Sequence, residues 1–358
     1  MAPKPAETVA LNYKTNYWDL YPRREDISLV SLKPLAEGVG VRLKLRSDMR
    51  GFSHFLYSLN DSPFERAVGD AVDIRYEDKG TGKVESARIS SKAVADDGRE
   101  SEAYGININY YPSEHYAAGG QTSNGWIIIQ HTDMALTSSR VEDWILQHPT
   151  DEEVEFARKT WGHLIQDGRS SYENACAIAR SIIDDLDPHR GIPSDAMGKL
   201  SPFGQYERVM AGKDRLWCGN IAGIFSYACN SLGIPCRGIG MNRSAPDQPP
   251  KGSRYTLLLA EGHGSTEIFS EEHNAWVWID LTFYILDAHL GDEGPINMAE
   301  LYHYLNDPNR LKSLRVVTYD PKSKSDANTL VTDSEKQGAL HNYFKRDQEF
   351  HYRRSVRP

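Results

Sequence analysis

Four short motifs within residues 215–282 decide the fold of this chain. They read Leu216-Trp217-Cys218-Gly219-Asn220, Gly233-Ile234-Pro235-Cys236-Arg237, His263-Gly264-Ser265-Thr266-Glu267-Ile268 and Trp276-Val277-Trp278-Ile279-Asp280-Leu281-Thr282. In this order they supply a thiol, an imidazole and a carboxylate, namely Cys218, His263 and Asp280. A cysteine nucleophile needs these three groups, because the imidazole moves a proton for the thiol and the carboxylate orients the imidazole. The motifs therefore predict nucleophilic catalysis at Cys218.

Cys218 stands at the start of a predicted helix. After it, apolar residues recur at the spacing of one helix face, and Gly233 with Pro235 ends the pattern. A helix N-terminus favours an anion, so this position predicts a lowered pKa for the thiol and N–H donors for a developing oxyanion. The candidates for contacting the substrate or the oxyanion are Trp217, Gly219, Asn220 and Glu267. For Trp217, simple packing beside the helix start is an equally good interpretation.

The imidazole and the carboxylate come from a predicted β-hairpin. We expect strands over residues 255–260, 265–269 and 275–280, with a turn at 271–274. This turn pairs Ser270 with Ala275 and places His263 diagonally opposite Asp280 on one face of the sheet, within side-chain reach. A turn one residue longer would place the two on opposite faces. His273 lies in the turn itself, so His263 is the predicted base.

These motifs resemble the transglutaminase-like superfamily, whose members share a papain-like core and a Cys-His-Asp triad. The resemblance rests on Cys-Gly-Asn opening a helix, Leu-Gly-Ile-Pro-x-Arg after it, His followed four residues later by Glu-Ile, and Trp-Val-x-x-Asp-x-Thr. It spans roughly residues 149–290 and implies that Cys218, His263 and Asp280 form the triad. The superfamily includes proteases, amidases, peptide N-glycanases, amide-forming enzymes and inactive relatives, so the resemblance implies a fold and a triad but no particular substrate.

The N-terminal third of the chain reads as β structure. Short runs between residues 26 and 111 alternate or are apolar throughout, and turns rich in Gly, Asn and Asp separate them. Such strands predict a β-sandwich, which resembles immunoglobulin or fibronectin type III-like modules of bacterial enzymes. We expect a packing module. The alternative is a sugar-stacking or peptide-binding surface made by Tyr104, Tyr110, Tyr111 and Tyr116.

The patterns divide the chain into five segments. We expect a flexible N-terminal segment over 1–25, the sandwich over 26–115, a linker with an interface strand over 116–148, an α+β catalytic domain over 149–320, and over 321–358 a tail that docks on the body. The capping box Thr150-Asp151-Glu152-Glu153 predicts the first helix of the catalytic domain. Further helices are predicted over residues 172–186 and 298–305.

Composition restricts the partners and the compartment. The 358 residues include 41 Lys and Arg against 50 Asp and Glu, a formal net charge of −9, and no dense basic run, which argues against a nucleic-acid or anionic-membrane surface. Neither a membrane span nor a signal peptide is recognisable, so the chain as written is expected in the cytoplasm. A periplasmic or extracellular location follows if a presequence has been removed.

The function predicted from these observations is hydrolysis of an amide or peptide bond in a peptide, glycopeptide or protein, through a thioester on Cys218. An amine-accepting transglutaminase or an amide-forming enzyme is one alternative, and an inactive binding or scaffold protein of the same fold is another. Cys176, Cys229 and Cys236 are expected to be buried free thiols. No metal-ligand spacing appears, and no metal or organic cofactor is implied. The oligomeric state is not predicted.

Overall fold

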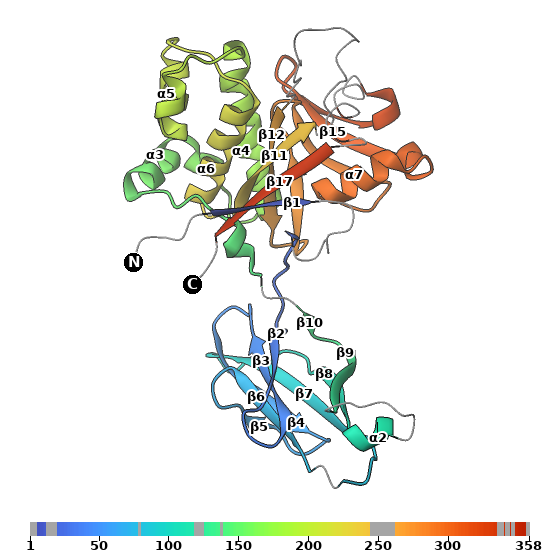
Figure 1. The fold of residues 1–358 in the computed structure, drawn as a ribbon. Coiled ribbons are helices and arrows are strands. Elements are labelled where there is room, and N and C mark those ends of the chain that lie inside the picture. The colour runs from blue at the N-terminus through green and yellow to red at the C-terminus, as the bar shows by residue number, and fades with distance from the viewer. Residues whose placement is uncertain are drawn as a thin grey trace, which may run out of the picture. The chain divides into compact units, whose positions relative to one another are not determined.

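The computed structural model describes residues 6–11, 20–77, 80–117, 125–136, 139–243, 262–334, 340, 344 and 348–355. The chain forms two compact units: one is Pro22–Arg140, and the other combines Met1–Tyr21 with Val141–Pro358. The first unit is a β structure and the second mixes helices with sheets, so the α+β class is confirmed (Figure 1). The strand expected over 255–260 lies outside the described residues. Within the described ranges, no helix is long and apolar enough to cross a membrane.

A five-stranded antiparallel sheet forms the centre of the α+β unit. Its strands, in spatial order, are β1 (Ala6–Leu11), β17 (Gln348–Ser355), β11 (Cys236–Arg243), β12 (Gly262–Ser270) and β13 (Ala275–Ile279). Successive residues of a strand point to opposite faces, and here both faces are apolar: Ile268 and Val277 belong to one core, while Phe269 and Trp278 belong to the other. Both faces of the sheet are therefore covered.

Four helices cover one face of this sheet and contribute to its first core. They are α3 (Asp151–Trp161), α4 (Ser171–Leu186), α5 (Pro202–Met210) and α6 (Cys218–Ser231). The predicted capping box at Thr150 is present, because Thr150 and Glu153 cap each other's backbone N–H groups at the start of α3. Helical 3₁₀ turns connect and extend these elements: η1 (Val141–Trp144), η2 (Gly162–Leu164), η3 (Asp187–His189) and η4 (Met197–Lys199).

The other face of the sheet is covered by the C-terminal part of the unit. These elements are α7 (Met298–Asn306), η5 (Arg310–Ser313), η6 (Val331–Asp333) and a three-stranded antiparallel sheet of β14 (Ile285–Leu290), β15 (Leu314–Asp320) and β16 (Ser325–Leu330). Apolar residues of α7, β14 and β15 share the second core with Phe269, Trp276 and Trp278, while Leu286 of β14 and Tyr319 of β15 belong to the first core. Complete burial of one large apolar side chain stabilises a fold by about 1.5–3 kcal/mol, so this core holds the C-terminal elements firmly on the sheet.

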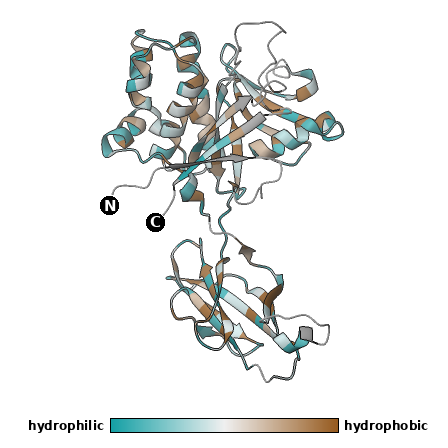
Figure 2. Ribbon diagram, in the orientation of Figure 1, coloured by the Kyte–Doolittle hydropathy of each residue, from teal (hydrophilic) through white to brown (hydrophobic). Residues whose placement is uncertain are grey.

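The unit Pro22–Arg140 is a two-sheet sandwich with one hydrophobic core. One sheet has the order β10 (Ala135–Leu136), β2 (Ser28–Pro34), β3 (Val39–Arg46) and β6 (Ala71–Tyr76). The other has the order β5 (Glu65–Arg66), β4 (Phe52–Leu59), β7 (Glu85–Ala95), β8 (Tyr104–Tyr111) and β9 (Trp126–Thr132), with the short helix α2 (Ser113–Ala117) between β8 and β9. Hydrophobic and hydrophilic residues alternate along these strands (Figure 2), as the period of a half-buried strand requires. The predicted sandwich architecture is present, while its relation to immunoglobulin-like modules stays a prediction.

The domain boundaries in the structure differ from those predicted from the sequence. β1 pairs with β17 and belongs to the central sheet, so residues 1–25 are not simply a flexible segment. β9 and β10 complete the sandwich sheets, so 116–148 is not a linker, and the α+β unit resumes at Val141. The sandwich is therefore inserted into the α+β unit after Tyr21.

The C-terminal segment is also more than a docked tail. β17 lies between β1 and β11 inside the central sheet, and β16 completes the second sheet, so residues 321–358 contribute two strands. In this sheet Ile239 lies opposite Tyr352. Pairing between residues so far apart in the chain leaves no local pattern, and this is why the sequence motifs did not predict it.

Candidate active site

Cys218 is the first residue of α6, where the sequence pattern predicts it. Asn220 fixes this helix start, because its Oδ1 accepts the Trp217 N–H at 3.2 Å and its Nδ2 donates to Gln205 Oε1 of α5 at 2.9 Å. Both ends of the Asn220 amide are thus used within the fold. Asn220 therefore helps to position the helix that carries the thiol, and its contact with a substrate or an oxyanion stays a prediction.

The lack of a side chain at Gly264 lets β12 run directly against the first turn of α6. A Cβ atom added to Gly264 would lie 3.1 Å from Gly219 Cα and 3.4 Å from Gly219 N, closer than ordinary packing allows. The backbone N–H groups of Gly264 and Gly219 both hydrogen-bond the Cys218 sulfur. Gly219 therefore contributes through its backbone, since a Cβ added to Gly219 itself would meet nothing within 4 Å.

His263 and Asp280 meet as the predicted hairpin register requires. The ladder of β12 and β13 runs from Thr266 opposite Ile279 to Ser270 opposite Ala275, so the predicted pairing is confirmed. His263 Nε2 lies 2.7 Å from Asp280 Oδ2, and both side chains are almost completely buried. The imidazole also hydrogen-bonds the Cys218 thiol. Because Nε2 is held by the carboxylate, this second bond uses Nδ1.

The surroundings of the thiol and the imidazole favour a charged pair. Burial raises the pKa of Cys218, but the bond from His263 and the two backbone N–H groups outweigh it, and the net direction is downward. Burial lowers the pKa of His263, but the charge and hydrogen bond of Asp280, reinforced by Cys218, raise that pKa to about 10. The two groups titrate as one coupled pair. Both shifts favour a thiolate beside an imidazolium, which is the reactive form of a cysteine nucleophile.

The other three cysteines lack these features. Cys176, Cys229 and Cys236 are buried free thiols, as predicted, whereas Cys218 is only partly buried. Burial raises the pKa of Cys176 to about 12 and that of Cys229 well above its ordinary value. A thiol held in its neutral form is a poor nucleophile, so the structure singles out Cys218.

Glu267 is a structural residue, which corrects its place among the substrate or oxyanion candidates. Its side chain is fully buried and accepts hydrogen bonds from Arg237 Nη2 at 2.7 Å and Arg237 Nε at 3.0 Å. Its other oxygen accepts from the Tyr21 hydroxyl at 2.9 Å and from the Met298 N–H at 2.8 Å. These bonds connect the N-terminal segment, the sheet and the start of α7. No oxygen of this carboxylate is left for a substrate.

Trp217 remains a candidate for substrate contact. It is 54% exposed beside the thiol. The segment after His189 runs alongside it, because the Leu216 N–H donates to His189 O at 3.2 Å and Leu216 O accepts from the Gly191 N–H at 2.9 Å. Ile192 follows this contact and is 80% exposed. Trp217 thus offers apolar surface beside the nucleophile, and Ile192 offers more on the segment that pairs with Leu216.

The sequence analysis missed Arg190 as a residue near the site and excluded His273 as the base. Arg190 donates to the carbonyl oxygens of Leu281 at 3.0 Å and Thr282 at 2.7 Å, directly behind Asp280. No motif surrounds Arg190 in the sequence, so no pattern could have marked it. His273 belongs to the hairpin turn, where its Nδ1 lies 2.7 Å from Ser270 Oγ.

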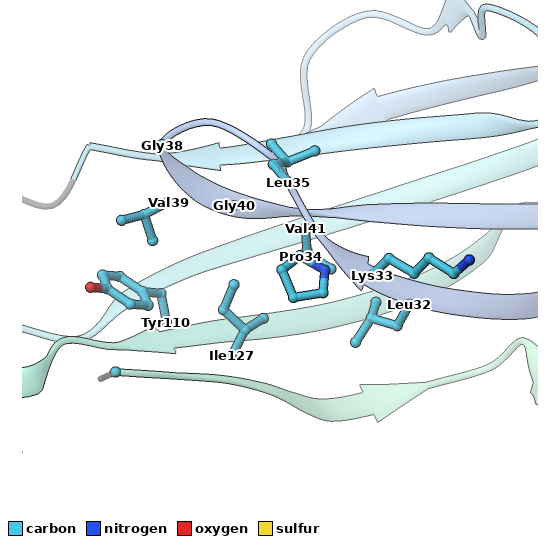
Figure 3. Close-up of a pocket in the computed structure, with 11 residues that line it drawn as sticks. Leu32, Lys33, Pro34, Leu35, Gly38, Val39, Gly40, Val41, Tyr110 and Ile127 are labelled. Carbon is cyan, nitrogen blue, oxygen red and sulfur yellow. The ribbon is translucent and has the colours of Figure 1, made fainter. Parts of the chain in front are cut away.

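The sandwich contains a hollow of about 390 Å³ (Figure 3). Apolar side chains of the β2–β3 hairpin face Tyr110 and Ile127 across it. Tyr110 is 5% exposed and tilts against Tyr76 in the core. Tyr111, the next residue of the strand, points to the opposite face, so the alternative of one tyrosine surface is not supported. The side chain of Tyr116 lies outside the described residues.

The comparisons with known proteins give little information about the function of this chain. No protein-family model matches the sequence, and no curated protein matches it. Among solved structures, the chain is similar to the crystal structure of a proposed cysteine protease from Cytophaga hutchinsonii, with 10% sequence identity and a TM-score of 0.26. The likeness covers 77% of this chain and 74% of that chain. The functional conclusion therefore rests on the geometry around Cys218.

Proposed function

We propose that the protein is a transglutaminase-like cysteine enzyme that hydrolyses an amide or peptide bond through a thioester on Cys218. The observation that carries the proposal is the continuous contact from Asp280 through the His263 ring to a partly exposed thiol at a helix start. In this reading Cys218 is the nucleophile, His263 transfers the proton and Asp280 orients the imidazole. The acyl donor is a peptide, glycopeptide or protein.

Acylation starts from the thiolate and imidazolium pair. The Cys218 sulfur attacks the carbonyl carbon, a C–S bond forms, and the carbonyl electron pair moves to the oxygen. The first turn of a helix has N–H groups without intrahelical partners, and those of α6 adjoin Cys218, so they are suited to stabilise this oxyanion. His263 then gives its Nδ1 proton to the amide nitrogen, the C–N bond breaks, and the amine leaves.

Deacylation returns the site to its starting state. The neutral His263 takes a proton from water while the water oxygen attacks the thioester carbon. The C–S bond breaks, the acid product leaves, and the thiolate and imidazolium are restored. An amine in place of water would give a new amide, which is the transglutaminase alternative.

Isotope labelling distinguishes these reactions. The protein is incubated with a mixture of defined peptides in water enriched in ¹⁸O, and in parallel with added hydroxylamine. Hydrolysis places ¹⁸O in a newly formed carboxylate, and capture of the thioester by hydroxylamine gives a hydroxamate; mass spectrometry detects both. The Cys218→Ala variant is expected to form neither product.

Two results would count against the proposal. Equal product formation by Cys218→Ala would remove the nucleophile from its role. A wild-type protein that forms no product, and whose Cys218 reacts with iodoacetamide like an ordinary free thiol, would favour the binding or scaffold alternative.

A further inference from the structure

Arg190 connects the two segments that carry the candidate site. Its backbone forms a parallel bridge with Leu216, two residues before Cys218. Its guanidinium donates from Nη1 to Thr282 O at 2.7 Å and from Nη2 to Leu281 O at 3.0 Å, on the segment that follows Asp280. One residue therefore contacts both the approach to the nucleophile and the turn that follows the carboxylate.

The two carbonyl groups that Arg190 holds belong to the same peptide groups that hold Asp280. Asp280 Oδ1 accepts the Thr282 N–H at 3.0 Å and the Phe283 N–H at 3.2 Å. The peptide group between Leu281 and Thr282, and the next one along the chain, each have a cation at the carbonyl end and the Asp280 carboxylate at the N–H end. Hydrogen bonds joined in this way polarise and strengthen one another.

The guanidinium itself is fixed in place. Its carbon lies 4.3 Å from the ring centre of Tyr284, and its Nε lies 3.1 Å from Asp187 Oδ1. The Tyr284 hydroxyl donates to the same Asp187 oxygen. Tyr284 has a φ of 60°, which is unfavourable for a bulky residue and persists where its surroundings hold it. In the described part of the chain, the charged groups that act on this assembly include Asp187, Asp280, Asp320 and Arg215, whose Nη1 donates to Arg190 O at 3.3 Å.

We propose that Arg190 is a positioning residue of the site, an inference that rests on the proposed function. It acts through Asp280: by fixing two peptide groups it fixes the carboxylate, and the carboxylate fixes the His263 ring that faces Cys218. The planar guanidinium reaches two carbonyl oxygens at once, whereas a lysine ammonium is a single point charge. Charge alone is therefore not enough for this role.

The test measures the rate at which iodoacetamide alkylates Cys218 across pH, with peptide mapping to locate the label. The proteins are the full-length wild type, Arg190→Gln, Arg190→Lys and the control Arg315→Gln. Arg315 likewise holds oxygens of a neighbouring strand, Asn328 Oδ1 and Asn328 O, both at 2.8 Å, in the sheet of β14 to β16. We expect both Arg190 variants to lose about tenfold in rate at about pH 6 because the thiolate pKa rises. The control should match the wild type.

A double-mutant cycle separates positioning from general support of the fold. If Arg190 acts through Asp280, Arg190→Gln adds no further loss in an Asp280→Asn background; independent effects would add and would overturn the inference. Full rescue by Arg190→Lys would also overturn it, because charge alone would suffice. Protection of the three buried cysteines shows that each variant is folded. If Arg190→Gln does not fold, Arg190→Lys decides alone, and an unchanged rate contradicts the inference.

Failure of this inference differs from failure of the proposed function. A wild-type Cys218 with the pH profile of a free thiol contradicts the proposed function. A wild-type Cys218 with a lowered pKa that Arg190→Gln leaves unchanged contradicts the role of Arg190 alone.

Discussion

Two buried ion pairs each have one member on strand β12, four residues apart, and the two pairs have different roles. His263 lies 2.7 Å from Asp280, and Glu267 lies 2.7 Å from Arg237. All four side chains are at most 3% exposed. Four aromatic rings surround the Arg237 guanidinium at 4.0–5.2 Å, contributed by Trp276, Tyr21, Tyr352 and Trp144. The His263 ring instead packs against Phe283, with ring centres 4.7 Å apart, and its Nδ1 is left for the thiol.

The difference teaches that burial and ion pairing do not by themselves mark a functional site. Both oxygens of the Glu267 carboxylate accept hydrogen bonds, and arginine is not a residue type that exchanges protons in catalysis. The His263 pair contains a group that can exchange a proton and that touches a partly exposed nucleophile. We therefore expect the Glu267–Arg237 pair to control stability and the His263–Asp280 pair to control chemistry.

The largest expected effect is on turnover in the His263 pair. We expect His263→Ala to lower turnover by several orders of magnitude, on the scale of triad deletions. His273→Ala is the matched control and should change turnover little, since His273 bonds Ser270 in the hairpin turn. Initial rates of both variants in the ¹⁸O assay check this. A folded His263→Ala protein with near-normal turnover would remove the imidazole from the mechanism.

The next largest effect is on stability in the Glu267 pair. Glu267→Ala leaves the Arg237 charge buried without its partner, and removal of one partner of a buried pair costs about 3–5 kcal/mol of unfolding free energy. The combined change Arg237→Met with Glu267→Leu should recover much of that loss, because no unpaired charge remains. Urea unfolding measures both variants, and the iodoacetamide reactivity of Cys218 should stay at its wild-type level in the folded double variant. A loss of thiol reactivity in the folded double variant would show that the Glu267–Arg237 pair also affects the chemistry of the site.

The features of the site that the sequence predicted correctly are those that depend on residues close together in the chain. The period of apolar residues placed Cys218 at a helix start, and the length of the turn fixed the register that joins His263 to Asp280. Both depend on neighbours in sequence. The role of Glu267 depends on Tyr21, Arg237 and Met298, which come from distant segments. For this reason the sequence placed Glu267 in the site although the fold uses it elsewhere.

The insertion of the sandwich was hidden for the same physical reason. Leu20 and Tyr21 join the core of the α+β unit together with Val141 and Trp144, on the far side of the insertion in sequence. A strand pairing such as that of Val9 with Tyr352 connects the two ends of the chain. Local patterns report the faces of elements and the turns between them, but not which distant strands pair.

A smaller effect is expected where β12 contacts α6, beside the His263 pair. In Gly264→Ala the new Cβ would lie 3.1 Å from Gly219 Cα, so the strand must shift from the helix start that it supports. We expect roughly tenfold slower alkylation of Cys218 and a stability loss of about 1–3 kcal/mol. Gly240 is the matched control because it lies opposite Gly264 in the sheet, and a Cβ there meets His351 Cβ at an ordinary 3.7 Å. Equal rates in the two variants would show that this close contact does not tune the thiol.

The smallest expected effect is the pH dependence of stability, which separates a titrating pair from a permanent one. Burial opposes the shift, but Asp280 is the first of the groups that raise the pKa of His263 to about 10 in the intact site. In a Cys218→Ala background the thiol is absent, and Asp280 should still hold that pKa above its unfolded value of about 6.5. A group whose pKa is raised on folding stabilises the protein below its unfolded pKa, and this contribution is lost as the pH rises through the folded value.

The measurement is the difference in unfolding free energy between Cys218→Ala and Cys218→Ala with His263→Ala, obtained from urea unfolding at several pH values. That difference should be constant just below about pH 6.5 and should shrink as the pH rises above that value through the raised pKa of His263. The corresponding difference between wild type and the Arg237→Met, Glu267→Leu variant should stay level over this range, because arginine and glutamate side chains do not ordinarily exchange protons there. A level curve for the His263 pair would mean that its proton is not held by Asp280, and the distinction between the two buried pairs would then rest on the thiol alone.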